Sequence, residues 1–391
     1  MTLRIFFYVQ HLLGVGHVFR AKRIIDACLD AGHHVTIALG GRAIPTLAFG
    51  SAEVVQLPPI HAGDGVFTNL VRSDATPLTD TFKAERTEAL KAAFDDVRPD
   101  VLILEAYPFA RRAFRFELLP LLEAAIARAP RPLVLSSLRD ILQPPSSQEK
   151  GQAALEIFER YFDGALVHGD PNAARIEESY PPLAAATAHC HYTGLVVPEC
   201  KAMSSNGAPH YDVLVSAGGG AVGAILHETA INAKAQTSLA DAQWLVLTGP
   251  NLPPETDDRI RSHAAAAGVD VETFRSDLPA LMANATLSIQ QAGYNTVADL
   301  LQTDCRAVLV PYTEGGETEQ ATRAAFLADK GRAVVVNDAD LSAGALASAI
   351  EAALQSTPSP MSLATDGARR SVELIEELFA KQRDDNSRQD A

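Results

Sequence analysis

The stretch RIFFYVQHLLGVGHVFRAKRIIDAC, residues 4–28, decides the fold. Its first six residues are apolar or aromatic apart from Arg4, which is typical of a buried β-strand. Its last eight residues place apolar side chains every three or four positions, which is the spacing of one helical face. A Gly-Val-Gly triplet lies between the two segments. A strand, a glycine-containing turn and a helix in this order predict the first unit of a parallel α/β domain.

The same alternation of short β-rich runs and helical stretches continues along the chain and predicts a parallel α/β architecture. Residues 198–209 have no periodicity and begin and end with proline, so we expect a linker there. Asp212 then restarts the pattern seen at residue 4, which predicts two similar doubly wound domains facing a ligand-binding cleft. Strands are expected at residues 4–9, 34–39, 101–104, 133–136, 165–168, 213–216, 244–247, 287–289, 307–310 and 332–336.

The composition excludes several classes of protein. The 391 residues are 47% hydrophobic and 21% charged, and their net charge of -15 disfavours nucleic acid and anionic membranes unless basic residues are locally concentrated. No apolar run is long enough for a membrane span and the N-terminus does not resemble a secretory signal, so we expect a cytoplasmic protein. The four cysteines lack CxxC spacing, and no metal site is predicted.

The first glycine-rich turn predicts an anion site. Gly14 and Gly16 let the backbone approach a ligand, and the amides at the following helix start favour negative charge. The dinucleotide fingerprint GxGxxG is the alternative, but Phe19 replaces its third glycine. His17 follows directly. The helix macrodipole disfavours a charged imidazole there, so His17 suits a general base, with a simple helix-capping role as the alternative.

Three motifs follow in the second half: SAGGGAVG at residues 216–223, QQAGYNTVADLL at 290–301 and EQATRA at 319–324. In this order they resemble the C-terminal donor domain of glycosyltransferases related to MurG, the peptidoglycan N-acetylglucosaminyltransferase. The glycine loop before His17 is similar to the N-terminal loop of that family. The segments EAYPFAR (105–111), LRDI (138–141), HGDP (168–171) and YTG (192–194) resemble a bacterial branch of predicted glycosyltransferases.

The resemblance implies a GT-B fold, with an acceptor-binding domain at residues 1–197, a linker at 198–210 and a donor-binding domain at 211–365. The last helix, at 366–391, would pack back on the first domain. The implied activity is inverting transfer of a sugar from a nucleoside diphosphate, more specifically a uridine diphosphate, to an acceptor hydroxyl. No metal or other cofactor is implied, and Asp338-Ala-Asp340, a DxD sequence, is interpreted as a capping turn before a helix.

Donor-binding roles follow from the same resemblance. Asp299, expected in the first turn of a helix, would accept hydrogen bonds from the ribose hydroxyls. Glu319 and Gln320, at a helix start capped by Thr318, would bind the donor sugar. The further donor-binding positions are Gly14, Gly16, Ser216, Gly218, Gly219, Gly220, Phe274, Arg275, Gly293, Asn295, Thr296 and Arg323.

Three of these assignments have a structural alternative. Asp299 could instead stabilise its helix dipole, Glu319 could lie in a solvated helix start, and Arg275 could be a surface arginine. The chain also departs from the MurG type, which has a glutamate where Asp299 stands and a glutamine where Glu319 stands.

In the first half, Glu105 follows an expected strand and could orient His17, as the carboxylate does in a serine protease triad. Asp140 is the rival for this role or for acceptor binding. Arg111 and Arg139 could recognise an acidic acceptor, with a solvated surface position as the alternative for each. The long polar stretch at residues 61–86 is interpreted as a loop, either functional or disordered, that could cover the acceptor.

Two other functions remain open at this point. A sugar-nucleotide hydrolase or epimerase on the same fold would use the same glycine loop with histidine. A non-catalytic sugar-nucleotide sensor would need Asp299 and the glycine loops but not His17. Replacing His17 separates the sensor from the enzymes.

Overall fold

The computed structural model describes the chain except residues 13–15, 45–46, 64–68, 198–209, 219–222, 276, 315–317, 362 and 390–391. The chain divides into two compact units, Met1–Val196 with Leu363–Ala391, and Val197–Ser362. Apart from His210, the predicted linker lies outside the described residues.

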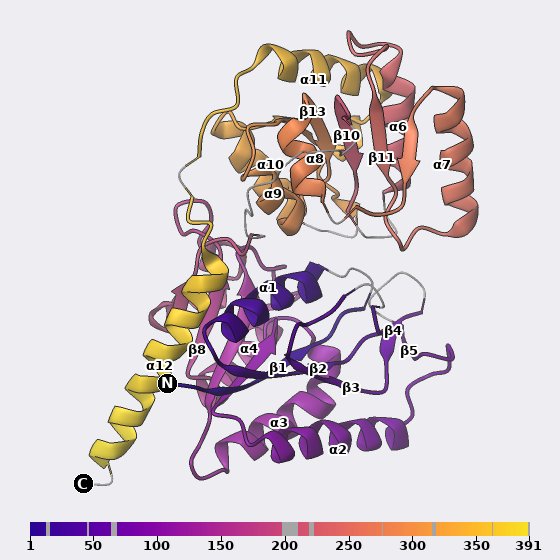
Figure 1. Ribbon diagram of the computed structural model, residues 1–391. Helices are drawn as coiled ribbons and strands as arrows, with labels where there is room; N and C mark the ends of the chain where they lie inside the picture. The colour runs from indigo at the N-terminus through magenta and orange to yellow at the C-terminus, as the bar shows by residue number, and fades with distance from the viewer. Residues whose placement is uncertain are drawn as a thin grey trace. The chain divides into compact units, whose positions relative to one another are not determined.

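Among the described residues, the N-terminal unit has a seven-stranded sheet in the order β3-β2-β1-β6-β7-β8-β9. Figure 1 labels β1, β2, β3 and β8 of this sheet. Every neighbouring pair is parallel. The strand order reverses between β1 and β6, which makes their carboxyl ends the topological switch point. The strands are β1 (Arg4–Val9), β2 (His34–Leu39), β3 (Glu53–Gln56), β6 (Val101–Glu105), β7 (Leu133–Arg139), β8 (Gly164–His168) and β9 (Cys190–Tyr192).

Helices cover both faces of this sheet. Phe6 and Tyr8 of β1 pack under one set of helices, whereas Ile5 and Phe7 point to the other set, because successive side chains of a strand alternate. The first set is α2 (Asp80–Val97), α3 (Arg115–Ile126) and α4 (Gln148–Tyr161); the second is α1 (Gly16–Asp30) and α12 (Gly367–Gln389). Burial on both faces explains why these strands are continuous apolar runs in the sequence.

The prediction of one loop over residues 61–86 is wrong. Strands β4 (Ile60–Ala62) and β5 (Leu70–Arg72) pair antiparallel there, and α2 begins at Asp80. The Thr79 side chain caps that helix by accepting a hydrogen bond from the Phe82 amide at 3.2 Å. Strands of three residues are too short to show periodicity, and the exposed edge strand β3 has no apolar run either. Shorter helical segments are η1 (Arg112–Phe114), α5 (Ile176–Ser179) and η2 (Pro181–His189).

The described part of the C-terminal unit repeats this plan with a six-stranded parallel sheet in the order β12-β11-β10-β13-β14-β15. Its switch point lies between β10 and β13. The strands are β10 (Val213–Ser216), β11 (Trp244–Leu247), β12 (Asp270–Glu272), β13 (Leu287–Gln290), β14 (Arg306–Leu309) and β15 (Val334–Val335). One face carries α6 (Ala224–Lys234), α7 (Pro254–Ala266) and α11 (Ala343–Gln355); the other carries α8 (Leu278–Asn284), α9 (Tyr294–Leu300) and α10 (Glu319–Asp329).

The predicted doubly wound α/β architecture is confirmed in both units. Across the part of the chain that the structure describes, no helix combines the length and the apolar character that a membrane span requires.

Candidate active site

A histidine and a carboxylate meet at the switch point of the N-terminal sheet. His17 lies in the first turn of α1, which follows β1, and Glu105 is the last residue of β6 on the other side of the reversal. His17 Nδ1 lies 2.9 Å from Glu105 Oε1. The Glu105 side chain is fully buried, whereas 23% of the His17 side chain is exposed. Ligands of open α/β sheets bind at this edge, so the pair stands where chemistry is expected.

Glu105 fixes the tautomer of His17. An ionised carboxylate can only accept hydrogen bonds, so the His17 Nδ1–H is the donor. Arg20 Nη2 lies 3.2 Å from the same Nδ1, and because both nitrogens carry protons, the Glu105 oxygen accepts from both. The lone pair of the imidazole is then on Nε2. His17 can therefore take up a proton through Nε2.

A buried polar chain supports Glu105 from the neighbouring strands. Ser137 of β7 donates from Oγ to Glu105 Oε2 at 2.6 Å, and His168 Nε2 lies 3.0 Å from the same hydroxyl. His168 Nδ1 in turn lies 3.0 Å from Thr193 Oγ1. Because the single Ser137 proton goes to Glu105, the His168 Nε2–H donates to Ser137, whereas the Thr193 hydroxyl donates to the Gly194 carbonyl at 2.8 Å. Each strand end thus holds the next group in one orientation.

The surroundings keep His17 neutral and Glu105 ionised. Burial, together with the positive charge of Arg111, lowers the pKa of His17 to about 4, although Glu105 acts in the opposite direction. Burial raises the pKa of Glu105, but Arg20, His17 and Ser137 outweigh it and hold that pKa well below its usual range. A neutral imidazole is predicted from the helix dipole, but burial is the largest cause of the lowered pKa.

Arg111, Arg139 and Asp140 lie at the same edge of the sheet. Arg111 has a left-handed backbone with φ 60° and donates from Nε to the Gln10 carbonyl at 2.9 Å. Burial lowers its pKa to about 10, and the charge of Arg139 acts in the same direction. Asp140 is buried, and its Oδ1 accepts from the Ile141 amide at 2.9 Å. Of the two carboxylates considered for His17, Glu105 is the one that holds it. Both arginines are half-buried, so neither is a fully solvated surface residue.

A second glycine-rich turn follows β10 at the switch point of the C-terminal sheet. Ser216 ends β10, and its Oγ accepts a hydrogen bond from the Gly218 amide at 3.2 Å. Gly218 has φ +72°, a conformation that favours glycine. The Ser216 carbonyl accepts from the amide of Gln291, which follows β13, at 3.2 Å. The turn therefore lies beside the second motif. Gly219 and Gly220 lie outside the described residues, as does Gly14 in the first unit.

Helix α9 carries the second motif, and the expected position of Asp299 in it is wrong. Gly293 is the N-cap, and Asn295 and Thr296 occupy the first turn. Asp299 is buried in the last turn, because α9 spans only residues Tyr294–Leu300. A carboxylate at that end is not stabilised by the helix dipole, so this alternative is excluded.

Arg323 joins the third motif to the second. It donates to the Ala292 carbonyl through Nη1 and to Glu319 Oε1 through Nη2, both at 2.8 Å. Gln320 Oε1 accepts from the Tyr312 amide, which follows β14, at 3.1 Å. Glu319 is buried, so a solvated helix start is excluded for it.

The expected Thr318 cap at the start of α10 is wrong. In the described segment Thr318 makes no side-chain capping hydrogen bond, because its backbone is helical rather than extended.

The Phe274-Arg275 motif makes local contacts. Arg275 forms salt bridges with Asp277 at 2.7 Å and Glu272 at 3.3 Å, and hydrogen bonding to Asp277 raises its pKa. Phe274 beside it is 49% exposed. Their contacts with a donor stay a prediction.

Asp338–Asp340 forms a 3-10 turn before α11, whose cap is Ser342: its Oγ accepts from the Ala345 amide at 3.2 Å. Within the described residues no group of three or more His, Cys, Asp or Glu side chains could hold a metal ion.

Residues 213–378 match the glycosyltransferase family 28 C-terminal domain. This range covers the described C-terminal sheet and the first half of α12. A UDP-N-acetylglucosamine--N-acetylmuramyl-(pentapeptide) pyrophosphoryl-undecaprenol N-acetylglucosamine transferase of Paraburkholderia phymatum is 42% identical over 84 residues, or 22% of each chain. The Burkholderia cenocepacia protein of the same name is 32% identical over 193 residues, covering 48% of this chain and 47% of its own. The chain thus spans less than half of either relative.

Solved structures extend the similarity to both units. Acinetobacter baumannii MurG aligns over 96% of this chain and 99% of its own, with a TM-score of 0.59 and 16% sequence identity. The chain therefore has the GT-B fold and carries a match to the glycosyltransferase family 28 C-terminal domain in its second half. The calicheamicin glycosyltransferase CalG4 aligns over 97% of this chain and 95% of its own, with a TM-score of 0.56 and 15% identity. At such identities the structural likeness shows the GT-B fold.

Several residues around His17 were not predicted from the sequence. Arg20, Ser137, His168 and Thr193 all belong to the polar chain that ends at His17. A signal existed for two of them: Ser137 interrupts an apolar run, and His168 ends one. A polar side chain at the carboxyl end of a buried parallel strand must find a partner, and that partner is commonly part of a site.

Proposed function

We propose that this protein is an inverting, metal-independent glycosyltransferase that moves a sugar from a uridine diphosphate to an acceptor hydroxyl. The single observation that carries the proposal is the His17–Glu105 pair at the switch point, 2.9 Å apart. The pair supplies a neutral base whose orientation is fixed by a buried, ionised carboxylate. That combination suits removal of a proton from a hydroxyl group.

The reaction begins when the acceptor oxygen attacks the anomeric carbon while its proton passes to His17 Nε2. The bond between the anomeric carbon and the diphosphate oxygen breaks, and the nucleoside diphosphate leaves with the electron pair. Attack opposite the leaving group inverts the anomeric carbon. The ionised Glu105 stabilises the imidazolium that forms, as the carboxylate of a serine protease triad does for its histidine.

The C-terminal unit is proposed to hold the donor. The turn after β10 and the start of α9 both lie at the switch point, and we propose that their backbone amides neutralise the departing diphosphate without a metal. Asp299 is proposed to bind the ribose, Gln320 and Glu319 the sugar, and Phe274 with Arg275 the base. The relatives that share this domain are named as transferases that use UDP-N-acetylglucosamine, which supports uridine as the base and makes that compound the first donor to test.

The test has two stages. Calorimetric titration with UDP, GDP and ADP should show preferential binding of UDP, and a purine preference would overturn the choice of base. Turnover of UDP-N-acetylglucosamine is then followed as UDP release, with free sugar measured separately, because free sugar as the sole product in the presence of acceptors indicates a hydrolase. His17→Ala should lose about a hundredfold to ten-thousandfold in turnover, with UDP affinity unchanged.

His34→Ala is the matched control, since this exposed histidine lies at the amino end of β2, away from the carboxyl edge. Unimpaired turnover of His17→Ala would remove histidine from the mechanism and leave Glu105 or Asp140 as the base.

A further inference from the structure

A basic pocket lies at the amino edge of the N-terminal sheet, opposite the edge that carries His17. It has a volume of about 270 Å³ and is formed where β1 begins, where α2 ends, by the segments just before β6 and β7, and by α12. Its charged lining residues are Arg4, Arg98, Asp100, Arg128, Arg131 and Arg383. Among the described residues it therefore gathers five arginines around one aspartate, in a chain whose net charge is -15. This is the local concentration of basic residues that the overall composition does not reveal.

Three of the arginines are paired with carboxylates. Arg4 forms a salt bridge with Asp100 at 3.2 Å, and Arg131 forms one with Asp163 at 2.8 Å. Arg128 lies 3.7 Å from the largely exposed Asp95 and packs over a phenylalanine ring. These three pairs leave the positive charges of the other two lining arginines uncompensated.

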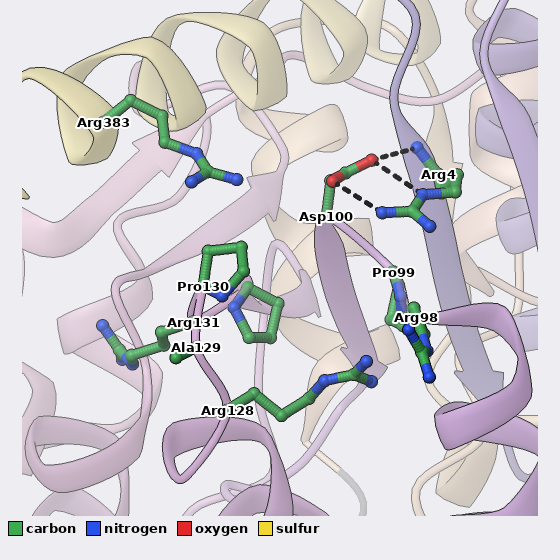
Figure 2. A pocket seen from close by; sticks show the side chains of 10 residues that line it. Arg4, Arg98, Pro99, Asp100, Arg128, Ala129, Pro130, Arg131 and Arg383 are labelled. Carbon is green, nitrogen blue, oxygen red and sulfur yellow. Dashed lines mark hydrogen bonds and ion pairs between the residues drawn. The ribbon is translucent and has the colours of Figure 1, made fainter.

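The other two arginines, Arg98 and Arg383, form no salt bridge with any carboxylate in the described part of the chain, although Arg383 contributes to lowering the pKa of Asp100. Arg98 caps α2 in the left-handed region, with φ 47°, a position that favours glycine. Arg383 packs over the Phe379 ring at 4.9 Å, which holds its stem against α12. In Figure 2, the Arg383 side chain extends from its helix toward the middle of the view, the Arg128 side chain extends toward Arg98, and the Arg131 side chain points away from both.

We propose that this pocket binds a small phosphate-bearing anion, with Arg98 and Arg383 as its principal ligands and Arg128 as a third. Guanidinium groups match phosphate oxygens in pairs, so a pocket lined by several arginines favours phosphate over a spherical anion. The volume lies below the roughly 300 to 1,000 Å³ of sites for drug-sized ligands and suits one or two phosphate groups. The same chemistry comes from free phosphate or diphosphate and from the headgroup of an anionic lipid.

A bound anion would also tie α12 to the sheet, because Arg383 belongs to α12 whereas Arg98 and Arg128 follow α2 and α3. Binding should therefore stabilise the N-terminal unit. The proposal concerns a separate edge of the sheet and does not depend on the transfer reaction.

The test compares the whole protein with two double variants of equal charge. Arg98→Ala/Arg383→Ala removes the two arginines that have no salt bridge. Arg160→Ala/Arg369→Ala removes two exposed arginines of the same unit outside the pocket. Titration with inorganic phosphate and pyrophosphate is followed by calorimetry and by thermal unfolding. The unmodified protein and the control should bind equally and melt at higher temperature with the anion, whereas the pocket variant should bind about a hundredfold more weakly, roughly tenfold for each arginine.

A second arm identifies the source of the phosphate. Sedimentation with phosphatidylglycerol vesicles, against phosphatidylcholine vesicles, shows whether the pocket takes a lipid headgroup. Vesicle binding that the pocket variant loses and the control keeps supports the proposal with a lipid ligand. If the unmodified protein binds neither soluble anion nor anionic vesicles, or if the pocket variant binds as well as the control, the proposal is wrong.

Discussion

Replacing Glu105 by Gln tests the buried polar chain behind His17. The substitution keeps the size of the side chain but removes its charge, and both Glu105 and its partner Arg20 are buried. Removing one partner of a buried ion pair leaves an uncompensated charge, so we expect the variant to lose about 3 to 5 kcal/mol of unfolding free energy. A glutamine can present either its oxygen or its amide nitrogen to His17, so the Nδ1–H tautomer is no longer fixed. Turnover should fall by about a hundredfold or more.

Glu117 provides a matched control for this change. It forms an ion pair with Arg86 at 2.6 Å, and both side chains are fully buried in the same unit. Glu117→Gln therefore strips a buried arginine of its carboxylate in the same way, without contacting His17. We expect a similar loss of stability but turnover within a fewfold of the unmodified protein, when both are measured below their unfolding transitions.

Urea unfolding and UDP release from UDP-N-acetylglucosamine give the two readouts. Ser137→Ala, which keeps the Glu105–Arg20 pair and loses one hydrogen bond to Glu105, gives a milder change, with a cost of about 1.5 to 3 kcal/mol and a smaller loss of turnover. Equal losses of turnover in Glu105→Gln and Glu117→Gln would contradict a role of Glu105 in orienting His17, since the effect would then be general destabilisation. A Glu105→Gln variant that keeps both its stability and its rate would contradict this role as well.

Three further outcomes are expected. Asp299→Asn should weaken UDP binding about tenfold by calorimetry, the cost of a charge-assisted hydrogen bond, and unchanged affinity would remove Asp299 from the donor site. Burial lowers the pKa of His168 to about 3 and of His227 to about 4, so the folded state binds fewer protons than the unfolded state below pH 6.5. The contribution of each neutral histidine to the free energy of unfolding should be fully present well above pH 6.5. It should fall by up to about 2 kcal/mol for each histidine by pH 5, as urea midpoints would show. Phe379→Ala, which truncates a buried side chain of α12, should destabilise the N-terminal unit by about 3 to 5 kcal/mol, whereas exposed Lys381→Ala should change urea unfolding by less than about 0.5 kcal/mol.

The sequence by itself determined the element types and the position of the glycine-rich turns. Strands buried on both faces are continuous apolar runs, so β1, β2, β10 and β11 begin and end where their apolar runs do. Helix α1 follows its turn at the expected place for the same reason: one face of α1 is buried in the core. Short strands at sheet edges, such as β3 and β9, lack that signal and were not predicted.

Only the tertiary structure decided which residues meet. Glu105 lies 88 positions from His17 and contacts it because β6 pairs with β1. Periodicity reports that a strand is buried but not which strand lies beside it. Strand order therefore placed Ser137 and His168 behind Glu105. For the same reason the arginine pocket was invisible in an acidic sequence, since its charges come from segments that only the packing of α12 and the strand starts brings together.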